Sequence, residues 1–373
     1  TDSVTGIGFQ PKAIYLWGTA VTDQSVTVHS AQWIGFADDA TPTRNQKVVA
    51  VTGENGTANP DTYRSAVEDA NAVLYILNAD GGATPPSPIA VATISSYDSD
   101  GFTLNYSTAA SGYIVHYVAY GGDDLQAFVG QSAANASPVN VVPFRPELVF
   151  VTTSCNESGH TNTYGNQSFG VFNDDLNQWW VGSNQGTEND AASEQNKDSI
   201  LRTDAFIGQM YQGTRTWSIS VTSITDTGFV WSGSNGDTFY YLALNISGLD
   251  TFVGNFTKET TGADPVSQDL PDFGFTPGFY MLASGSEINE TVNTPNSSRV
   301  TLGAYDGTTQ HSITRTDKRI TDASNQNADQ RSSSSAVLGI ADLDAAYDAL
   351  ATAQAITDST PTIQWSPNDT SPY

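Results

Sequence analysis

The chain has 373 residues, of which 14% are charged, and its formal net charge of -26 corresponds to a pI of about 4.1. A surface this acidic has no basic stripe that could neutralise phosphates, and an anionic lipid surface would repel it, so nucleic acid binding and membrane insertion are excluded. Aspartate far outnumbers glutamate and only five lysines occur, which resembles proteins of halophiles, where salt screens the repulsion between surface carboxylates.

The remaining composition predicts an all-β fold. Gly, Ser, Thr, Asn and Asp are abundant, and these residue types favour turns and strand edges over helices. No stretch of 18 apolar residues occurs, so no transmembrane helix is expected. The single cysteine, Cys155, excludes a disulfide within the chain.

The first predicted unit, residues 1–124, contains four landmarks in chain order. Residues 9–16 form an apolar strand introduced by an aromatic-Gln-Pro sequence, and proline suits the first position of a strand, where no ladder donor is needed. Residues 34–39 form a short strand that ends in an acidic turn, and residues 72–76 form an apolar strand. Residues 101–120 contain a Gly-Phe turn, a polar loop and a closing strand rich in aromatic residues.

These landmarks recur in the same order, at a period of roughly 130 residues. The second copies lie at 144–151, 169–174, 205–210 and 227–244. Third copies lie at 275–282, 302–307 and 336–340, and the fourth landmark is represented weakly at Thr362–Trp365. The recurrence predicts three tandem β-sandwich repeats of jelly-roll-like type, with boundaries at 1–124, 125–248 and 249–373.

A Phe-Val-Gly sequence near the start of the second and third units is predicted to be the opening strand of the sandwich that follows it. It lies within 125–130 and again within 249–254. The third unit, in contrast, ends before an aromatic closing strand, and a sheet that lacks a strand has unpaired backbone edges. The missing strand is therefore absent, through trimming or disorder, or it is supplied by a neighbouring subunit by β-addition, or the third unit has an atypical end that needs no such strand.

Residues 341–356 depart from the pattern of the other units. The segment is rich in alanine, and Leu343, Tyr347, Leu350 and Ala353 follow one another at a spacing of three to four residues. This spacing predicts a short amphipathic helix in the third unit.

The landmarks resemble a Gly-Phe-x-Pro β-sandwich repeat of tail-fibre-like and other virion structural proteins of tailed viruses. The residues that carry the resemblance are Phe239 to Leu244, the segment 252–256, and Gly274-Phe275-Thr276-Pro277. Where that family usually has a basic residue after the first strand, this chain has Trp17, Thr153 and Ser284, which weakens any inference of a shared ligand. The resemblance implies a virion location, a structural role and no catalytic residues.

Paired carboxylates occur at Asp38-Asp39, Asp123-Asp124 and Asp174-Asp175. A glycosidase uses two carboxyl groups on either side of the scissile bond, so a polysaccharide depolymerase is one hypothesis. The chain has 40 acidic residues, however, and these pairs lie at turn-like positions, so a role in turns is the preferred interpretation. No catalytic residues are therefore assigned.

Four histidines, His29, His116, His160 and His311, show no metal-ligand spacing, and neither a transition metal nor another cofactor is expected. Acidic turns such as Asp98-Ser99-Asp100-Gly101 are the places where Ca²⁺ or Na⁺ would bind weakly, although no EF-hand pattern is present.

Six tryptophans could stack on sugar rings if they were exposed, but their strand-like surroundings favour packing in the core: Trp33, Trp179, Trp180, Trp217, Trp231 and Trp365. Trp179 and Trp180 are the exception, because adjacent strand residues point to opposite faces and one of the two is then a candidate surface contact.

The sequence as a whole favours a non-enzymatic structural protein on the exterior of a tailed virus of a halophilic host. It would be a tail-fibre or baseplate element, or a capsid turret or decoration. Its partners would be other virion proteins, further copies of itself in a homo-oligomer, and a glycan on the host surface. Tandem sandwiches would form a stiff stalk with variable loops. The alternatives are a glycan-binding adhesin and, less favoured, a depolymerase.

Overall fold

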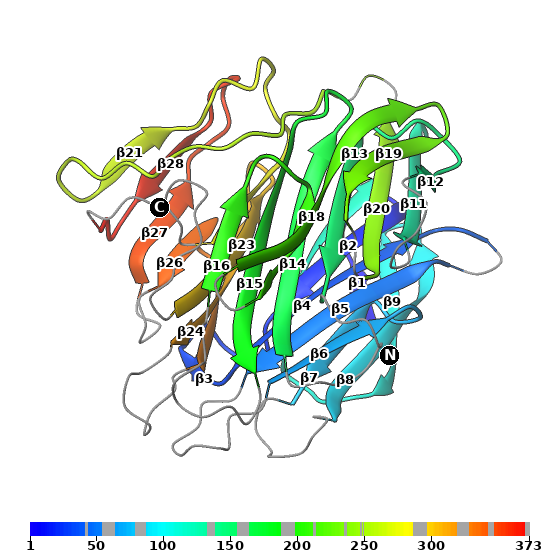
Figure 1. The fold of residues 1–373 in the computed structure, drawn as a ribbon, viewed down its shortest axis with the longest axis horizontal. Helices are drawn as coiled ribbons and strands as arrows, with labels where there is room; N and C mark the ends of the chain where they lie inside the picture. Colours follow the sequence, from blue (N-terminus) through cyan, green and yellow to red (C-terminus); the bar gives the residue numbers. More distant parts are fainter. Residues whose placement is uncertain are drawn as a thin grey trace.

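The computed structural model describes most of the chain, and its ribbon is shown in Figure 1. The described residues are 1–41, 44–53, 64–78, 87–132, 139–154, 164–187, 198–211, 214–234, 237–246, 248, 250–285, 297–318, 328–341 and 347–369. Within them the secondary structure consists of 28 β-strands and no helix, which confirms the all-β prediction. Every strand pair is antiparallel.

The first sandwich packs a five-stranded sheet, β10-β2-β4-β5-β6, against a four-stranded sheet, β1-β9-β8-β7. The strands of the larger sheet are β2 (Pro11–Gly18), β4 (Ser30–Asp38), β5 (Gln46–Gly53), β6 (Arg64–Asp69) and β10 (Val115–Gly121). The strands of the smaller sheet are β1 (Asp2–Thr5), β7 (Leu74–Leu77), β8 (Pro88–Asp98) and β9 (Gly101–Thr108).

The second sandwich repeats this order and adds one strand, β11, at the edge of its larger sheet, β11-β20-β13-β14-β15-β16. That sheet consists of β11 (Leu125–Ser132), β13 (Leu148–Thr153), β14 (Tyr164–Asn173), β15 (Gln178–Thr187), β16 (Asp198–Arg202) and β20 (Phe239–Ile246). The smaller sheet, β12-β19-β18-β17, consists of β12 (Val139–Val141), β17 (Ile207–Tyr211), β18 (Thr214–Thr225) and β19 (Gly228–Gly233).

The third sandwich has the same order again, except at the two edges of its larger sheet, β22-β23-β24-β25-β3. Its strands are β22 (Tyr280–Ser284), β23 (Ser297–Tyr305), β24 (Gln310–Lys318), β25 (Ala328–Ser333) and, contributed by the first part of the chain, β3 (Thr27–Val28). The smaller sheet, β21-β28-β27-β26, consists of β21 (Val266–Asp269), β26 (Leu338–Ala341), β27 (Tyr347–Ala353) and β28 (Thr362–Trp365).

The helix predicted at 341–356 is wrong for the part of that segment that the structure describes. Residues from Tyr347 to Ala353 form β27, and residues 342–346, including Leu343, lie outside the described part. Burial alternates along β27, with Ala349, Ala351 and Ala353 buried in the core of the third sandwich. Burial therefore repeats every two residues, as in a strand. The helix prediction was wrong because it relied on the larger side chains, which happen to be spaced three to four residues apart.

The glycine in the second landmark has a structural role that is the same in all three sandwiches. A methyl group on Gly35 would lie 1.7 Å from the carbonyl oxygen of Val73. The corresponding distances are 2.0 Å from Gly170 to Phe206 and 1.9 Å from Gly303 to Val337. The second and third landmarks therefore recur together because the chain of the third crosses directly over the glycine of the second, where no Cβ fits.

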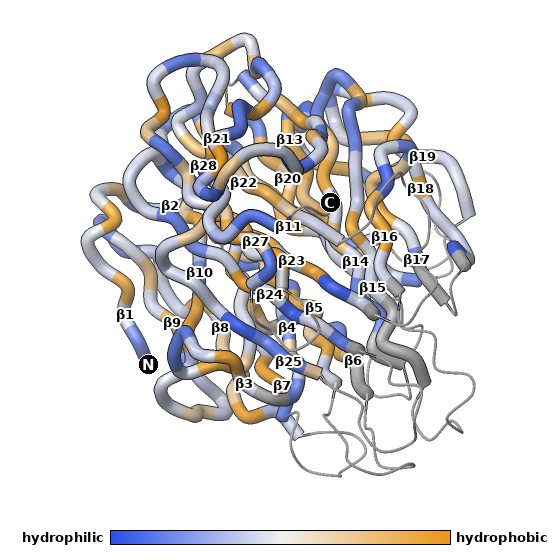
Figure 2. Tube along the Cα trace, turned by 90° about the vertical axis from the view of Figure 1, so that its left-hand side faces the viewer, coloured by the Kyte–Doolittle hydropathy of each residue, from blue (hydrophilic) through white to orange (hydrophobic). Residues whose placement is uncertain are grey.

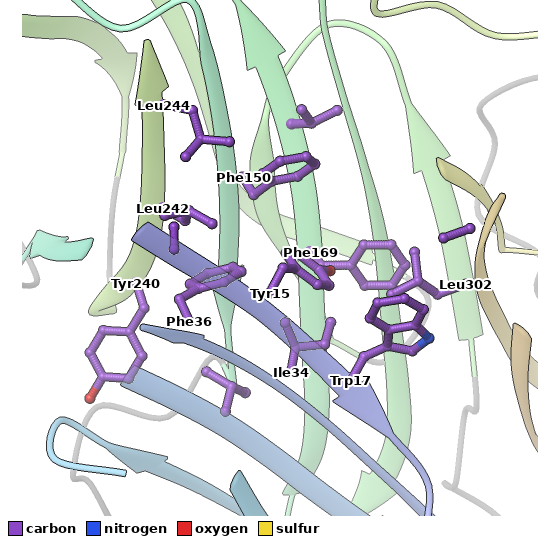
Figure 3. Packing of buried hydrophobic residues seen from close by; sticks show 14 of the residues in the cluster. Tyr15, Trp17, Ile34, Phe36, Phe150, Phe169, Tyr240, Leu242, Leu244 and Leu302 are labelled. Carbon is purple, nitrogen blue, oxygen red and sulfur yellow. The ribbon is translucent and has the colours of Figure 1, made fainter. Parts of the chain in front are cut away.

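The three sandwiches surround one shared core. A single cluster of buried side chains combines residues of all three larger sheets, among them Tyr15, Phe36, Phe169, Leu242 and Leu302 (Figure 3). The sheets also contact one another cyclically, because β6 contacts β14, β16 contacts β23, and β25 contacts β4. The sandwiches are thus grouped around a common centre and do not form the end-to-end stalk expected from the sequence (Figure 1).

Polar contacts join each pair of neighbouring sandwiches. Between the first and second, Glu68 Oε1 accepts hydrogen bonds from the backbone N–H of Ser154 (3.0 Å) and from its hydroxyl (2.9 Å). Between the second and third, the hydroxyl of Ser199 donates to the carbonyl of Gly285. Between the third and first, the hydroxyl of Ser30 donates to both carboxylate oxygens of Asp317, at 3.1 and 3.2 Å.

The five longest stretches that lie between the described ranges, 54–63, 155–163, 188–197, 286–296 and 319–327, have mainly polar sequences. Hydrophobic residues, in contrast, concentrate along the strands in the interior (Figure 2).

Candidate functional site

The tryptophan pair proposed as a surface contact does not form an exposed aromatic patch. Trp180 is fully buried, with Ile200 and Ala205 around it. Trp179 is half-buried and packs edge-on against Phe169 with ring centroids 6.3 Å apart, next to the shared core. The other tryptophans weighed as sugar-stacking groups, Trp33, Trp217, Trp231 and Trp365, are all buried, as the core interpretation predicted.

The carboxylate pairs occupy turns, as preferred from the sequence. Asp38 is fully buried, and its carboxylate accepts hydrogen bonds from the backbone N–H groups of Ala40 (3.1 Å), Asn45 (3.0 Å) and Val129 (2.8 Å). Asp174 pairs with Arg145 at 3.3 Å on the surface. Asp123 and Asp124 are exposed next to the β10–β11 turn.

The acidic turn at 98–101 uses its carboxylates for bonds within the protein. Asp98 Oδ2 accepts from the hydroxyl of Thr103 at 3.1 Å. The carboxylate of Asp100 accepts from the backbone N–H groups of Gly6 (3.0 Å) and Gly8 (2.6 Å). Within the described ranges, no group of three or more His, Cys, Asp or Glu side chains is arranged to hold a metal ion.

The structure brings together two histidines that lie far apart in the sequence. The rings of His116 and His311 lie 4.8 Å apart, and His116 Nε2 is 2.7 Å from the hydroxyl of Ser332. Burial, together with the neighbouring His311, lowers the pKa of His116 to about 3, so this imidazole is neutral at physiological pH. No sequence spacing signals the pair, because the residues come from β10 and β24. His160 lies outside the described residues.

Both histidines belong to the wall of a large cavity, which is the candidate functional site. Its volume is about 1140 Å³, and it lies next to the shared core, where residues of all three sandwiches line it. Three stretches of chain border it continuously: 114–120 along β10, 250–258, and 277–284 along β22. Figure 2 views the molecule from the side on which β10 and β22 lie.

The wall of the cavity is mostly apolar. Its interior is lined by Phe150, Leu244, Met281, Leu282 and Ala283, and all of these except Leu282 belong to the shared core or pack against it. Three of the few large hydrophobic side chains that are exposed lie around it: Phe9, Tyr117 and Phe252, each 37–41% exposed. The two carboxylates at its border, Asp250 and Asp306, are accompanied by Lys258.

The chemistry of this wall suits binding of apolar groups. Asp306 is held by its own turn, where its Oδ1 accepts hydrogen bonds from the backbone N–H groups of Thr308 (2.9 Å) and Thr309 (2.6 Å). An apolar wall with few polar groups is the composition that small-molecule binding sites usually have. The edges of β10 and β22 add backbone hydrogen-bonding groups to it.

Searches against protein-family models, curated proteins and solved structures returned no match. In the part of the chain that the structure describes, no helix is long and apolar enough to cross a membrane.

Proposed function

We propose that this chain is a non-enzymatic structural protein on the exterior of a tailed virus. It is a tail-fibre or baseplate element, or a turret or decoration of the capsid, and it acts in particle architecture. The sequence basis is the Gly-Phe-x-Pro repeat, which resembles that of virion structural proteins. A location on the capsid and a location on the tail would both require a rigid module on the outside of the particle.

The observation that best supports this function is the core that the three sandwiches share. This core fixes the three larger sheets relative to one another, because side chains from all of them pack in the same cluster. Interiors packed in this way have low compressibility, and a body built around one core is suited to be a rigid module on the outside of a particle.

The setting we propose is a virus of a halophilic host. The net charge of -26 lies mainly on the surface, because among the described residues most carboxylates are at least partly exposed and the buried ones are Asp38, Glu68, Asp237, Asp317 and Asp329. At molar salt the Debye length falls to about 3 Å and the repulsion between these carboxylates is largely screened.

The adhesin and the depolymerase receive less support. A glycan-binding adhesin would present clustered tryptophans at its surface, whereas six of the seven tryptophans are buried and Trp179 is half-buried beside the core. A depolymerase would bring two carboxyl groups together in a groove. Of the two carboxylates that border the cavity, Asp306 is engaged by its own turn.

The copy number of this chain in purified virus particles tests the proposal, and quantitative mass spectrometry measures it. Hundreds of copies per particle would identify a capsid turret or decoration, whereas a few to some tens would identify a tail or fibre component, since these positions follow the symmetry of capsid and tail. A chain found in infected cells but not in purified particles would overturn the virion proposal and favour the adhesin.

A further inference from the structure

A second, smaller pocket lies at one end of the first sandwich. Its volume is about 350 Å³. Residues at the start of β2, just after β4, near the end of β8 and in the turn between β10 and β11 line it. Because β8 belongs to the smaller sheet and the other strands to the larger one or its continuation, the pocket lies where the two sheets end side by side.

The hydroxyl of Tyr97 is the group that first indicates a ligand. Tyr97 is 8% exposed, and its hydroxyl oxygen is buried without a hydrogen-bond partner. Burial raises the pKa of Tyr97, and the carboxylates of Asp38 and Asp39 contribute while Arg44 acts against the rise, so the hydroxyl lies near all three. Buried polar groups almost always have a partner, and one that lacks it within the protein points to a bound molecule.

Two cations line the pocket with unused donors. The Nε of Arg44 is buried without a partner, and its guanidinium lies 5.5 Å from the ring centroid of Tyr97. The ammonium of Lys12 donates to the carbonyls of Asp123 (2.9 Å) and Leu125 (3.1 Å), which leaves one of its three donors. In a chain with 14 basic and 40 acidic residues, neither cation forms an ion pair with a described residue.

The carboxylate of Asp39 completes the polar lining. Burial raises the pKa of Asp39, whereas Lys12 and Arg44 act in the opposite direction, which places both cations near this carboxylate although neither pairs with it. With Asp123, the lining has two cationic and two anionic side chains. A neutral ligand therefore leaves no uncompensated charge in the pocket.

The arrangement requires a ligand whose groups both donate and accept hydrogen bonds. A hydroxyl group does both, because it can accept from Arg44 or Lys12 while it donates to Asp39. A carboxylate or phosphate only accepts and would be repelled by Asp39, and an ammonium group only donates and would be repelled by the two cations. Neutral polyhydroxylated molecules fit all of these side chains at once.

The size of the pocket and the aromatic ring at its border narrow the ligand further. Its volume is near the lower limit of small-molecule sites, which is about 300 Å³, so it has room for one ring. Phe9 lines the pocket and is 37% exposed, and it offers an apolar surface to the C–H face of such a ring.

We infer that this pocket binds one residue of a neutral sugar. The ring packs on Phe9, its hydroxyl groups accept from Arg44 and Lys12 and donate to Asp39, and the hydroxyl of Tyr97 gains the partner that it lacks. A structural protein of a particle can carry such a pocket as well as an adhesin can, so the inference goes beyond the proposed function and does not depend on it.

The test uses the purified full chain at molar salt, with the methyl glycosides of glucose, galactose, mannose and N-acetylglucosamine as separate probes. Saturation-transfer NMR detects binding. We expect at least one probe to bind saturably, with a Kd on the order of 1 mM, since a ligand of this size has few contacts. If none of the four binds saturably, ordered water alone fills the pocket and the inference is overturned.

Methyl glucuronide distinguishes a neutral sugar from an anionic one. Its carboxylate would lie close to Asp39 and Asp123, so we expect it to bind more weakly than the best neutral glycoside. Tighter binding of the glucuronide than of every neutral glycoside would overturn the assignment to a neutral sugar.

A pair of tyrosine variants locates the binding. Tyr97→Phe removes only the hydroxyl, and Tyr75→Phe makes the same change on β7, outside the pocket, at a tyrosine that is also 8% exposed. We expect the affinity for the bound glycoside to fall at least tenfold in the first variant and to stay unchanged in the second. Because the Tyr97 hydroxyl has no partner in the protein, its removal should leave the melting temperature unchanged. Equal affinity of the two variants would contradict the site.

A second pair tests the aromatic surface. Phe9→Ala removes the ring at the pocket, and Phe252→Ala removes a ring that is 41% exposed and does not line this pocket. We expect the affinity to fall at least fivefold in Phe9→Ala and to stay unchanged in Phe252→Ala. An unchanged affinity in Phe9→Ala would show that the ligand does not lie on this ring and would contradict the inferred arrangement.

Discussion

At the scale of single residues, Glu68 is the most informative group. It lies on β6, is 9% exposed, and receives hydrogen bonds from Ser154 and from the hydroxyl of Thr153 (3.2 Å) in the second sandwich. Burial raises its pKa to about 7 in spite of these donors, and the nearby carboxylate of Asp237 contributes to the rise. The junction between the first two sandwiches thus favours a protonated carboxyl group.

The sign of the resulting pH dependence follows from the raised pKa. The contribution of Glu68 to stability is fully present below its unfolded pKa of about 4.5, and it is lost as pH rises through about 7. We expect Glu68→Gln to leave stability nearly unchanged at pH 4.5 and to raise the free energy of unfolding by about 1–3 kcal/mol at pH 7.5. Denaturant unfolding at the two pH values measures the difference.

The control for this substitution is Asp124→Asn, which removes one negative charge from an exposed position. It should give the same small change at both pH values. A Glu68→Gln effect that does not grow with pH would show that the carboxyl group is not protonated preferentially in the folded chain.

At the scale of elements, the crossing of the third landmark over the strand glycine is the contact that recurs. The crossing residues, Val73, Phe206 and Val337, also donate equivalent backbone hydrogen bonds of 2.9–3.0 Å, to Ala92, Ile219 and Ala351. Each crossing thus joins the two sheets of its own sandwich at a point where only glycine fits. The equivalence of three such contacts explains why these short motifs keep their order and spacing.

Alanine substitutions test the crossing. We expect Gly35→Ala, Gly170→Ala and Gly303→Ala each to lower the free energy of unfolding by about 2–4 kcal/mol, because a methyl group would overlap a backbone carbonyl that cannot move alone. Gly278→Ala is the matched control, since nothing lies within 4 Å of its added Cβ. If the three core variants unfolded at the same denaturant concentration as this control, the close contact between each glycine and the backbone that crosses it would be contradicted.

At the scale of the whole molecule, the surface charge should make stability depend on salt. With a net charge of -26, self-repulsion favours the expanded unfolded chain at low ionic strength. We expect the melting temperature to rise steadily as potassium chloride increases into the molar range, because screening removes this repulsion. Sucrose at equal osmolality is the control, and an equal rise with sucrose would mean that exclusion of solute from the surface, and not screening, is responsible.

The sequence by itself determined the strand content and the recurrence of the motifs. Turns and strands depend on residues that are close together in the sequence. The Phe9-Gln-Pro, Gly-Phe and Tyr-rich segments could therefore be assigned to strands and turns from the sequence alone. Burial of most tryptophans followed from the same patterns. The segment at 347–353 shows the limit, because alanines can face a core as a strand or as a helix, and neighbouring strands β26 and β28 decide between the two.

Only the tertiary structure decided how the sandwiches are arranged and where the candidate site lies. The shared core, the His116–His311 pair and the addition of β3 to the sheet of the third sandwich join residues far apart in the chain. Such contacts depend on which apolar faces pack together. The alternation of residues along a strand indicates that one face is apolar, but it does not indicate which other face will cover it. Nothing in the sequence indicated the cavity that borders β22, because its wall is formed only when the three sandwiches pack together.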